Sequence, residues 1–254
     1  MEGKIILKSS REIEIMEQAG SIAGYVLSEM QKQAKPGMTT QELDQFAEDI
    51  ISEQGGIPSF KNFKGYPAAT CISLNSEIVH GIPSEKRLQD GDLVGIDIGV
   101  LFKGYHSDTA ISFVVGKSNP EKDKLLEITK LALDKAITMI RPGVHIGDIQ
   151  AIIQETVENA GFSVIRDLTG HGIGQNLQEP PAIPNYGEKG TGFILEKGMV
   201  LAIEPMVSAG AWPIEVMTDG WTIRMKDGSL AAHFEHTIAV GDAGAEILTQ
   251  PLTK

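Results

Sequence analysis

The sequence has a single cysteine, Cys71, in 254 residues, which excludes an intrachain disulfide. Basic residues are also scarce: 22 Lys and Arg stand against 34 Asp and Glu, giving a formal net charge of −12. This balance argues against specific nucleic acid or an anionic membrane surface as the main partner, and it leaves neutral or cationic substrates open. No apolar run approaches the roughly 18 residues that a membrane span needs.

The first residues, MEGKIILKSSREIE, contain no long apolar segment and no cleavage site of small residues. We therefore expect no signal peptide and a cytoplasmic protein. With 41% hydrophobic and 22% charged residues, the chain has an ordinary globular composition. Its length is sufficient for one large core or for two fused halves.

Helix starts are the clearest local signals. Ser9 with Glu12, and Thr39 with Glu42, form capping boxes ahead of apolar residues at helical spacing. Asn119-Pro120 has the pattern of an N-cap followed by proline at the first helical position. Between these helices we expect an ordered loop over 57–69 and one strand over 71–79.

An internal repeat links the two parts of the chain. The motif KPGM at 35–38 recurs as RPGV at 141–144, and the same offset of 106 residues aligns Gly55 with Gly161. We predict two similar α+β halves, about residues 9–115 and 116–245, with a ligand site at their seam. Two unrelated helix pairs with common capping chemistry are the alternative.

The stretch Asp92–Phe113 carries two acidic residues in a hairpin pattern. Asp97 interrupts an apolar run, and Asp108 follows the turn signal Lys103-Gly104. A turn there places Asp97 opposite Ala110, so the two carboxylates become diagonal cross-strand neighbours about 7–8 Å apart at Cα. Two like charges that close need a cation or a shared proton between them. Asp108 alone fits a solvated turn residue; the pair favours a metal site.

Three more candidate ligands lie in the second half. His171 lies among glycines in GHGIG, Glu204 ends the apolar strand before Pro205, and Glu235 interrupts the apolar pattern over 231–240. Four carboxylates and one imidazole suit Mn²⁺, Fe²⁺, Co²⁺ or Zn²⁺ better than a metal bound by thiolates. Two divalent ions would balance the four negative charges, and paired ions suit hydrolysis.

These motifs together resemble those of type I methionine aminopeptidases. The matching segments are DIG…GYHSDTA, GHGIG, AIEPM, DGWTIRMKDGSLAAHFEHT and HGIP, and the resemblance runs from about Lys8 to the C-terminus. It implies an α+β pita-bread fold, a single catalytic domain over 1–254 with pseudo-symmetric halves around a central antiparallel sheet. It also implies the compact bacterial form, because a zinc-binding extension and the type II insert are absent from the sequence.

The resemblance implies metal-dependent hydrolytic removal of the N-terminal methionine from nascent proteins and peptides, with a preference for a small second residue. Asp97 would bind one metal ion, Asp108 and Glu235 would bridge both, and His171 and Glu204 would bind the second. A bridging water or hydroxide would attack the carbonyl, and Glu204 would carry its proton to the leaving amine. The implied cofactors are two divalent ions, of Co²⁺, Mn²⁺, Fe²⁺ or Zn²⁺.

The resemblance also implies a substrate pocket. His80 would lie beside the scissile amide and form a hydrogen bond to substrate. An apolar pocket suits the long, unbranched methionine side chain, although plain core is the alternative reading of its lining. The lining residues would be Phe63, Tyr66, Cys71, Leu177 and Trp221.

One position departs from the family pattern. The family usually has a second histidine seven residues after the metal-binding one, and here that position is Gln178. Glutamine donates a hydrogen bond, but it neither carries a charge nor transfers a proton. We hypothesise partial compensation by His233, which would share a strand face with Glu235 because it lies two residues before it. The alternative is that Gln178 alone suffices.

The expected partners are nascent polypeptide N-termini, and the family is mostly monomeric. A transient ribosome association fits such a substrate, but the acidic net charge does not support it. Three alternatives stay open: a proline-specific aminopeptidase, which would carry an extra N-terminal domain, a non-catalytic binding module, and a metalloenzyme for an unrelated small amide. The presence of all five ligand residues weighs against the binding module.

Overall fold

The structure, a computed structural model, describes residues 3–251. The helices are α1 Ser10–Gln33, α2 Thr40–Glu53, the 3₁₀ turn η1 Phe63–Gly65, α3 Pro120–Met139 and α4 Ile146–Asn159. The strands are β1 Ile57–Pro58, β2 Thr70–Leu74, β3 Glu77–Val79, β4 Leu93–Phe102, β5 Tyr105–Val114, β6 Ser163–Val164, β7 Thr169–Gly172, β8 Glu179–Pro184, β9 Val200–Ile203, β10 Met206–Ser208, β11 Ile214–Val216, β12 Ile223–Met225, β13 Ala231–His233, β14 His236–Val240 and β15 Ala245–Ile247. In this part of the chain no helix is both long and apolar enough to span a membrane.

The predicted helix starts are confirmed in atomic detail. At the start of α1 the Ser9 hydroxyl accepts from the Glu12 amide, and the Glu12 carboxylate accepts from the Ser9 amide at 2.7 Å. Thr39 and Glu42 make the same reciprocal pair ahead of α2. Each box satisfies backbone N–H groups that have no partner within the first helical turn.

Corresponding hydrogen bonds recur in the two halves. The loop before α2 pairs with a later loop through Gly37 N to Leu88 O (2.8 Å) and Leu88 N to Met38 O (2.8 Å). The loop before α4 pairs in the same way, through Gly143 N to Leu195 O (2.9 Å) and Leu195 N to Val144 O (2.8 Å). The Pro-Gly loops keep the sequence offset of 106 residues, and their partners Leu88 and Leu195 lie 107 apart, so the repeat extends to the backbone contacts with a shift of one residue.

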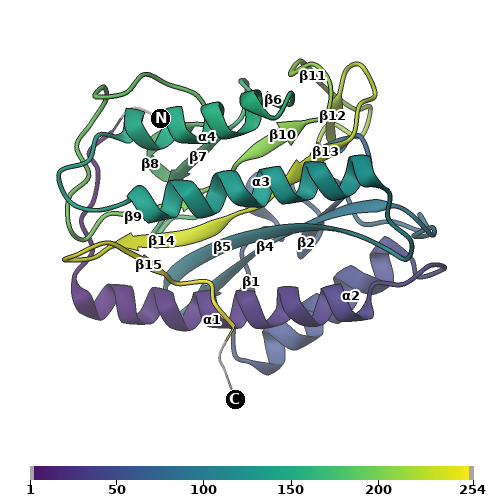
Figure 1. Ribbon diagram of the computed structural model, residues 1–254. Helices are drawn as coiled ribbons and strands as arrows, with labels where there is room; N and C mark the ends of the chain where they lie inside the picture. The colour runs from purple at the N-terminus through teal and green to yellow at the C-terminus, as the bar shows by residue number, and fades with distance from the viewer. Residues whose placement is uncertain (1–2, 252–254) are drawn as a thin grey trace.

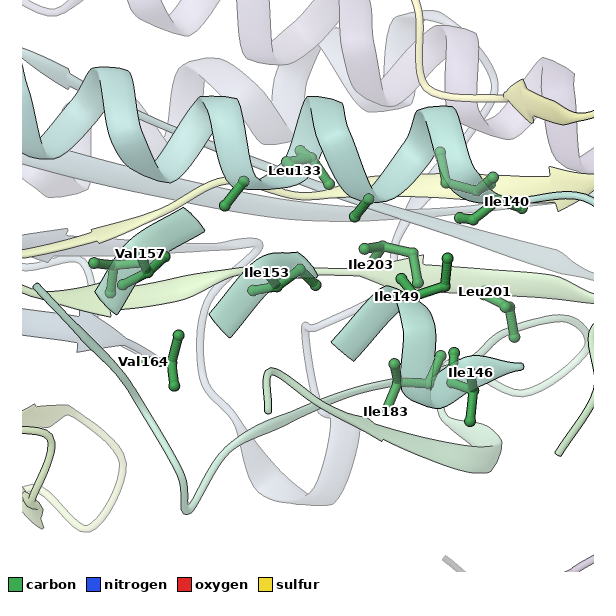
Figure 2. Close-up of a cluster of buried hydrophobic side chains, with 14 of the residues drawn as sticks. Leu133, Ile140, Ile146, Ile149, Ile153, Val157, Val164, Ile183, Leu201 and Ile203 are labelled. Atoms are coloured by element: carbon green, nitrogen blue, oxygen red, sulfur yellow. The ribbon is translucent and has the colours of Figure 1, made fainter. Parts of the chain in front are cut away.

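Each helix pair packs against strands of its own half. Apolar residues of α1 and α2 pack with β2 and β4, and those of α3 and α4 pack with β9 and β14. Figure 1 shows α1 and α3 running across the view with β5 and β14 between them. In Figure 2, Ile149 and Ile153 of α4 lie close to Leu201 and Ile203 of β9. The helices thus cover the sheets with their apolar faces, as an α+β architecture requires.

The central hairpin has the predicted register. β4 and β5 pair from Leu93 with Val114 to Phe102 with Tyr105, and Asp97 faces Ala110. Lys103 and Gly104 both have positive φ, 48° and 86°, which is the geometry of a two-residue type I′ turn. The turn signal read from the sequence therefore placed both acidic residues on one face.

Two expected strands are interrupted. The strand expected over 71–79 was wrong as a single element, because β2 ends at Leu74 and Asn75 adopts a left-handed conformation with φ 59°. The Asn75 side chain fixes the turn: its Nδ2 donates to Asp92 Oδ1 (2.9 Å), and its Oδ1 accepts from the backbone amide of Leu93 (3.1 Å). β2 pairs with β4 and β3 pairs with β12, so the chain changes sheets here.

The second interruption is shared by two neighbouring strand pairs. β9 and β10 are separated by Glu204-Pro205, and β13 and β14 are separated by Phe234-Glu235. The two breaks face each other, since Ile203 pairs with His236 and Met206 pairs with His233. The continuous strand expected over 231–240 is therefore wrong. Both Glu204 and Glu235 lie where the chain passes between the five-stranded sheet and a three-stranded one.

The C-terminal segment crosses α1 at two glycines. A Cβ added at Gly20 would lie 2.2 Å from the Leu248 carbonyl oxygen, and one at Gly24 would lie 2.4 Å from the Thr249 carbonyl oxygen. A methyl group at either position would collide with backbone, so only glycine permits this close crossing.

Candidate metal centre

The structure brings the five predicted ligand residues together at the seam of the two halves. The β4–β5 hairpin supplies Asp97 and Asp108, β7 supplies His171, and the facing strand breaks supply Glu204 and Glu235. His171 Nε2 lies 3.8 Å from Glu204 Oε1 and 3.9 Å from Asp108 Oδ2. Ligand atoms of Asp108, His171 and Glu235 all lie within 4.8 Å of one another.

Backbone bonds hold this cluster in register. The Glu235 amide donates to the Ala110 carbonyl at 2.9 Å, which ties the second strand break to the hairpin opposite Asp97. His171 Nδ1 lies 2.8 Å from the Gly172 carbonyl, which can only accept, so Nδ1 carries the proton. Nε2 then presents its lone pair toward the carboxylates, as a metal-binding imidazole must.

The cluster lacks protein partners for several buried oxygens. Asp97 Oδ1, Asp108 Oδ1 and Glu235 Oε1 are buried without a hydrogen-bond partner. Burial, together with the neighbouring carboxylates, raises the pKa of Asp108 and of Glu235 well above the usual range. Burial likewise raises the pKa of Asp97 and of Glu204 to about 7. Facing carboxylates without a cation are costly to ionise, so this donor set fits a divalent metal centre.

A cavity of about 320 Å³ opens beside the cluster. Every predicted site residue except His233 lines it, including His80 and Gln178. The sequence reading missed Phe60, Lys64, Val79, Asp167, Leu168, Thr169 and Met206, which also line it. Val79 and Met206 had a usable signal, since they flank His80 and the Glu204-Pro205 break directly in sequence.

One wall of the cavity is apolar. The Tyr66 and Trp221 rings meet edge to face, with centroids 5.2 Å apart and an interplanar angle of 81°. The Tyr66 hydroxyl bonds to the Gly81 carbonyl at 2.9 Å, so its only polar atom is satisfied away from the cavity. Cys71 and Leu177 are buried in the same cluster of side chains. Because Cys71 pairs with Asp97 in the sheet, this wall adjoins the carboxylates.

His80 follows β3 in a left-handed conformation, with φ 58°. Such a conformation is uncommon for a residue other than glycine, and it turns the chain directly after the strand. Burial lowers the pKa of His80 to about 4, and the nearby His233 and Lys64 contribute in the same direction. His80 is therefore a neutral imidazole near pH 7 that can donate one hydrogen bond and accept another.

His233 and Gln178 occupy different places. His233 Nε2 is buried without a hydrogen-bond partner, 3.6 Å from Glu204 Oε2 and 3.9 Å from Glu235 Oε2. Its backbone amide and carbonyl both bond to the Ser112 hydroxyl, at 2.9 Å each. Gln178 is exposed at the cavity and accepts from Lys64 Nζ at 3.0 Å. The hypothesis that His233 compensates for the missing histidine stays a prediction. It would act through its contact with Glu204.

Four carboxylates and an imidazole at the seam of two α+β halves, beside a cavity, define a metallohydrolase of the pita-bread type. The sequence profile of metallopeptidase family M24 matches residues 14–242, and the chain belongs to this family. It is 48% identical over 246 residues to methionine aminopeptidase 1 of Bacillus subtilis, covering 97% of this chain and 99% of the relative. It is 44% identical over 247 residues to the methionine aminopeptidase of Escherichia coli K12, covering 96% and 94%.

Solved structures give the same result for the fold. The crystal structure of methionine aminopeptidase from Thermotoga maritima matches with a TM-score of 0.96 and 46% identity, covering 97% of this chain and 100% of that one. Prolidase from Pyrococcus furiosus matches with a TM-score of 0.79 and 28% identity, covering 98% of this chain and 66% of that one. The predicted pita-bread fold and the resemblance to type I methionine aminopeptidases are both confirmed.

Proposed function

We propose that this protein is a methionyl aminopeptidase, which hydrolyses the peptide bond after an N-terminal methionine and prefers a small second residue. The observation that carries this proposal is the apolar wall of Tyr66, Cys71, Leu177 and Trp221 directly beside the carboxylate cluster. A flexible, unbranched side chain fits such a wall, while its α-amino group and scissile amide reach the polar end.

Asp97, Asp108, His171, Glu204 and Glu235 would hold two divalent ions, of Co²⁺, Mn²⁺, Fe²⁺ or Zn²⁺. The unpartnered buried oxygens of Asp97, Asp108 and Glu235 support this assignment. When bound, the ions would polarise the scissile carbonyl and lower the pKa of water at the site.

The chain's own residues account for the remaining steps. The apolar wall, with Phe63 at its edge, would bind the methionine side chain and exclude water from it. Glu204, whose carboxylate lines the cavity 3.8 Å from His171 Nε2, would accept a proton from the attacking water and donate it to the leaving amine. His80, neutral at pH 7, would donate a hydrogen bond to the substrate beside the scissile amide.

The natural substrates would be nascent polypeptide N-termini. We propose that residues 1–254 act as one catalytic domain, with halves about 9–115 and 116–245, as a cytoplasmic monomer. The corresponding backbone contacts of the two halves support this division. A transient ribosome contact would suit the substrate, and the net charge of −12 does not favour it. No membrane or specific nucleic acid partner is proposed.

The test is methionine release from Met-Ala-Ser by metal-stripped protein titrated with Mn²⁺, Co²⁺ or Fe²⁺. We expect metal-dependent release that is abolished by Asp97→Ala and by Glu204→Ala, with no cleavage of Ala-Pro-Ala. Absence of release from protein shown to have bound metal would refute the proposal, and cleavage of Ala-Pro-Ala instead would favour a proline-specific enzyme.

The compensation hypothesis has its own comparison. If His233 takes over part of the role of the missing histidine, His233→Ala lowers kcat/KM and Gln178→His reduces that loss. An unchanged kcat/KM in His233→Ala would remove His233 from the mechanism. Metal affinity, measured by calorimetry in the same variants, separates a role in holding Glu204 from a role in turnover.

A further inference from the structure

A lysine that the sequence pattern did not single out bridges the entrance of the cavity. Lys64 Nζ donates to Gln178 Oε1 at 3.0 Å, and the two residues are 114 positions apart in the sequence. Both side chains line the cavity and both are exposed. Lys64 comes from the first half and Gln178 from the second, so the bond joins the two halves at exposed residues of the cavity lining.

The backbone of Lys64 is held in an uncommon conformation. Lys64 has φ 51° and Asn62 has φ 70°, both in the left-handed region. Each such residue other than glycine costs roughly 1–2 kcal/mol, so the surrounding loop must fix it. The ammonium lies 4.9 Å from the centroid of the Phe63 ring, which itself lines the cavity. The position of Lys64 is thus set by the loop rather than by chance on a free surface.

The charge of Lys64 is not neutralised by the protein. Its hydrogen-bond partner is a neutral amide, and no ion pair to Lys64 is present among residues 3–251. Lys61 in the same loop differs, because it pairs with Glu48 at 2.5 Å. Outside the carboxylate cluster, Asp167 is the other formally charged residue of the lining that the structure describes. The cation at the mouth is therefore available to a ligand.

This arrangement also gives a physical reason for glutamine at 178. Its amide oxygen accepts from the ammonium, whereas a protonated imidazole there would repel it. Gln178 and Lys64 are thus a matched pair, in which Gln178 aims the cation over the mouth.

We propose that Lys64, oriented by Gln178, is a specificity-determining residue that binds an acidic side chain at the third position of the substrate. The inference rests on the proposed function. The first side chain occupies the apolar wall and the second is small, so the third is the first that can reach the mouth. The Lys64 ammonium has three donors, so it can donate to a substrate carboxylate there while it keeps its hydrogen bond to the Gln178 amide oxygen.

The experiment compares kcat/KM for Met-Ala-Glu-Ser-amide and Met-Ala-Gln-Ser-amide, which differ by one charge at equal size. The C-terminal amides remove the carboxylate that would otherwise also meet Lys64. We expect the parent to prefer the glutamate peptide about two- to fivefold at low salt, the range of an exposed ion pair. The preference should shrink in 0.5 M NaCl, because ions screen exposed charges.

The variants assign that preference to a residue. In Lys64→Met the ratio of kcat/KM for the glutamate peptide to kcat/KM for the glutamine peptide should fall to about one. The matched control Lys61→Met should keep the ratio of the parent. Gln178→Ala lowers the ratio, and the double variant lowers it no further than Lys64→Met alone. A ratio near one in the parent, or an unchanged ratio in Lys64→Met, overturns the inference. Failure of the proposed function is distinct, since the parent would then release no methionine from either peptide.

Discussion

Replacing Lys8 by methionine removes the cation of a buried ion pair next to the loop that carries Leu177 and Gln178. Lys8 Nζ lies 2.7 Å from Glu179 Oε2, and both side chains are only 4% exposed. The other carboxylate oxygen, Glu179 Oε1, accepts from the Asn176 amide at 3.0 Å. The pair therefore joins the N-terminal segment to the loop that carries Leu177 and Gln178.

The expected loss follows from what remains after the change. Lys8→Met leaves the Glu179 carboxylate buried and without its cation, which costs about 3–5 kcal/mol of unfolding free energy. In the double variant Lys8→Met/Glu179→Gln, the charge is also removed and an amide oxygen still accepts from Asn176. Its loss should be about 1–2 kcal/mol, the order of one hydrogen bond. The single variant should therefore be the less stable of the two.

Urea unfolding of the metal-stripped protein measures both losses, and the single variant should also melt on the order of 10 °C lower than the parent. Lys197→Met is the matched control: its pair with Asp242 is as short, 2.6 Å, but the side chains are 58% and 81% exposed. An exposed pair contributes about 0–1 kcal/mol. Equal losses in Lys8→Met and Lys197→Met, or in the single and double variants, would refute the reasoning.

Three other changes test the site, the helix cap and the C-terminal crossing. Asp108→Asn should abolish the thermal stabilisation by Mn²⁺, which in the parent reaches about 2.7 kcal/mol at 100 times Kd; a shift equal to the parent's would contradict its assignment as a ligand. Hydrogen bonds from Ser9 and Tyr105 lower the pKa of Glu12 from 4.5 to about 2, so the stability contributed by the Glu12 carboxylate is present above pH 4.5 and lost as pH falls toward 2. Glu12→Gln should make the free energy of unfolding less dependent on pH in this acidic range. A pH dependence equal to that of the parent would contradict the prediction. Gly20→Ala gains about 1 kcal/mol of helix propensity, yet its Cβ would lie 2.2 Å from the Leu248 carbonyl oxygen. We expect a lower free energy of unfolding in urea than in the parent. A higher one would show that the C-terminal segment moves away from α1 to make room for the methyl group.

The features that were predictable from the sequence depend on near neighbours. A capping box needs only residues three apart, and the Lys103-Gly104 turn sets the pairing of the strands beside it. Because side chains alternate along a strand, that register also placed Asp97 and Asp108 on one face. The local patterns and the family motifs were therefore sufficient for the helices, the hairpin and the grouping of the five ligand residues.

The features that were missed depend on partners distant in sequence. The break at Phe234-Glu235 exists because it faces the break at Glu204-Pro205, and no local pattern in 231–240 reports that partner. Asn75 likewise ends β2, because its side chain bonds to Asp92 and Leu93, which lie 17 and 18 residues further along the chain. Lys64 had no signal, since an exposed lysine in a loop is ordinary until its contact with Gln178 is known.

The crossing of the C-terminal segment over Gly20 and Gly24 has a consequence for synthesis in the cell. α1 is complete once Gln33 has been made, but the backbone that covers its glycines belongs to Leu248 and Thr249. At about 5–20 residues per second, the interval between the two is roughly 10–40 s. Throughout that time one face of the first helix is open to chaperones and to other nascent chains. Translation speed over the second half therefore sets how long this protein is exposed to misassembly before its fold closes.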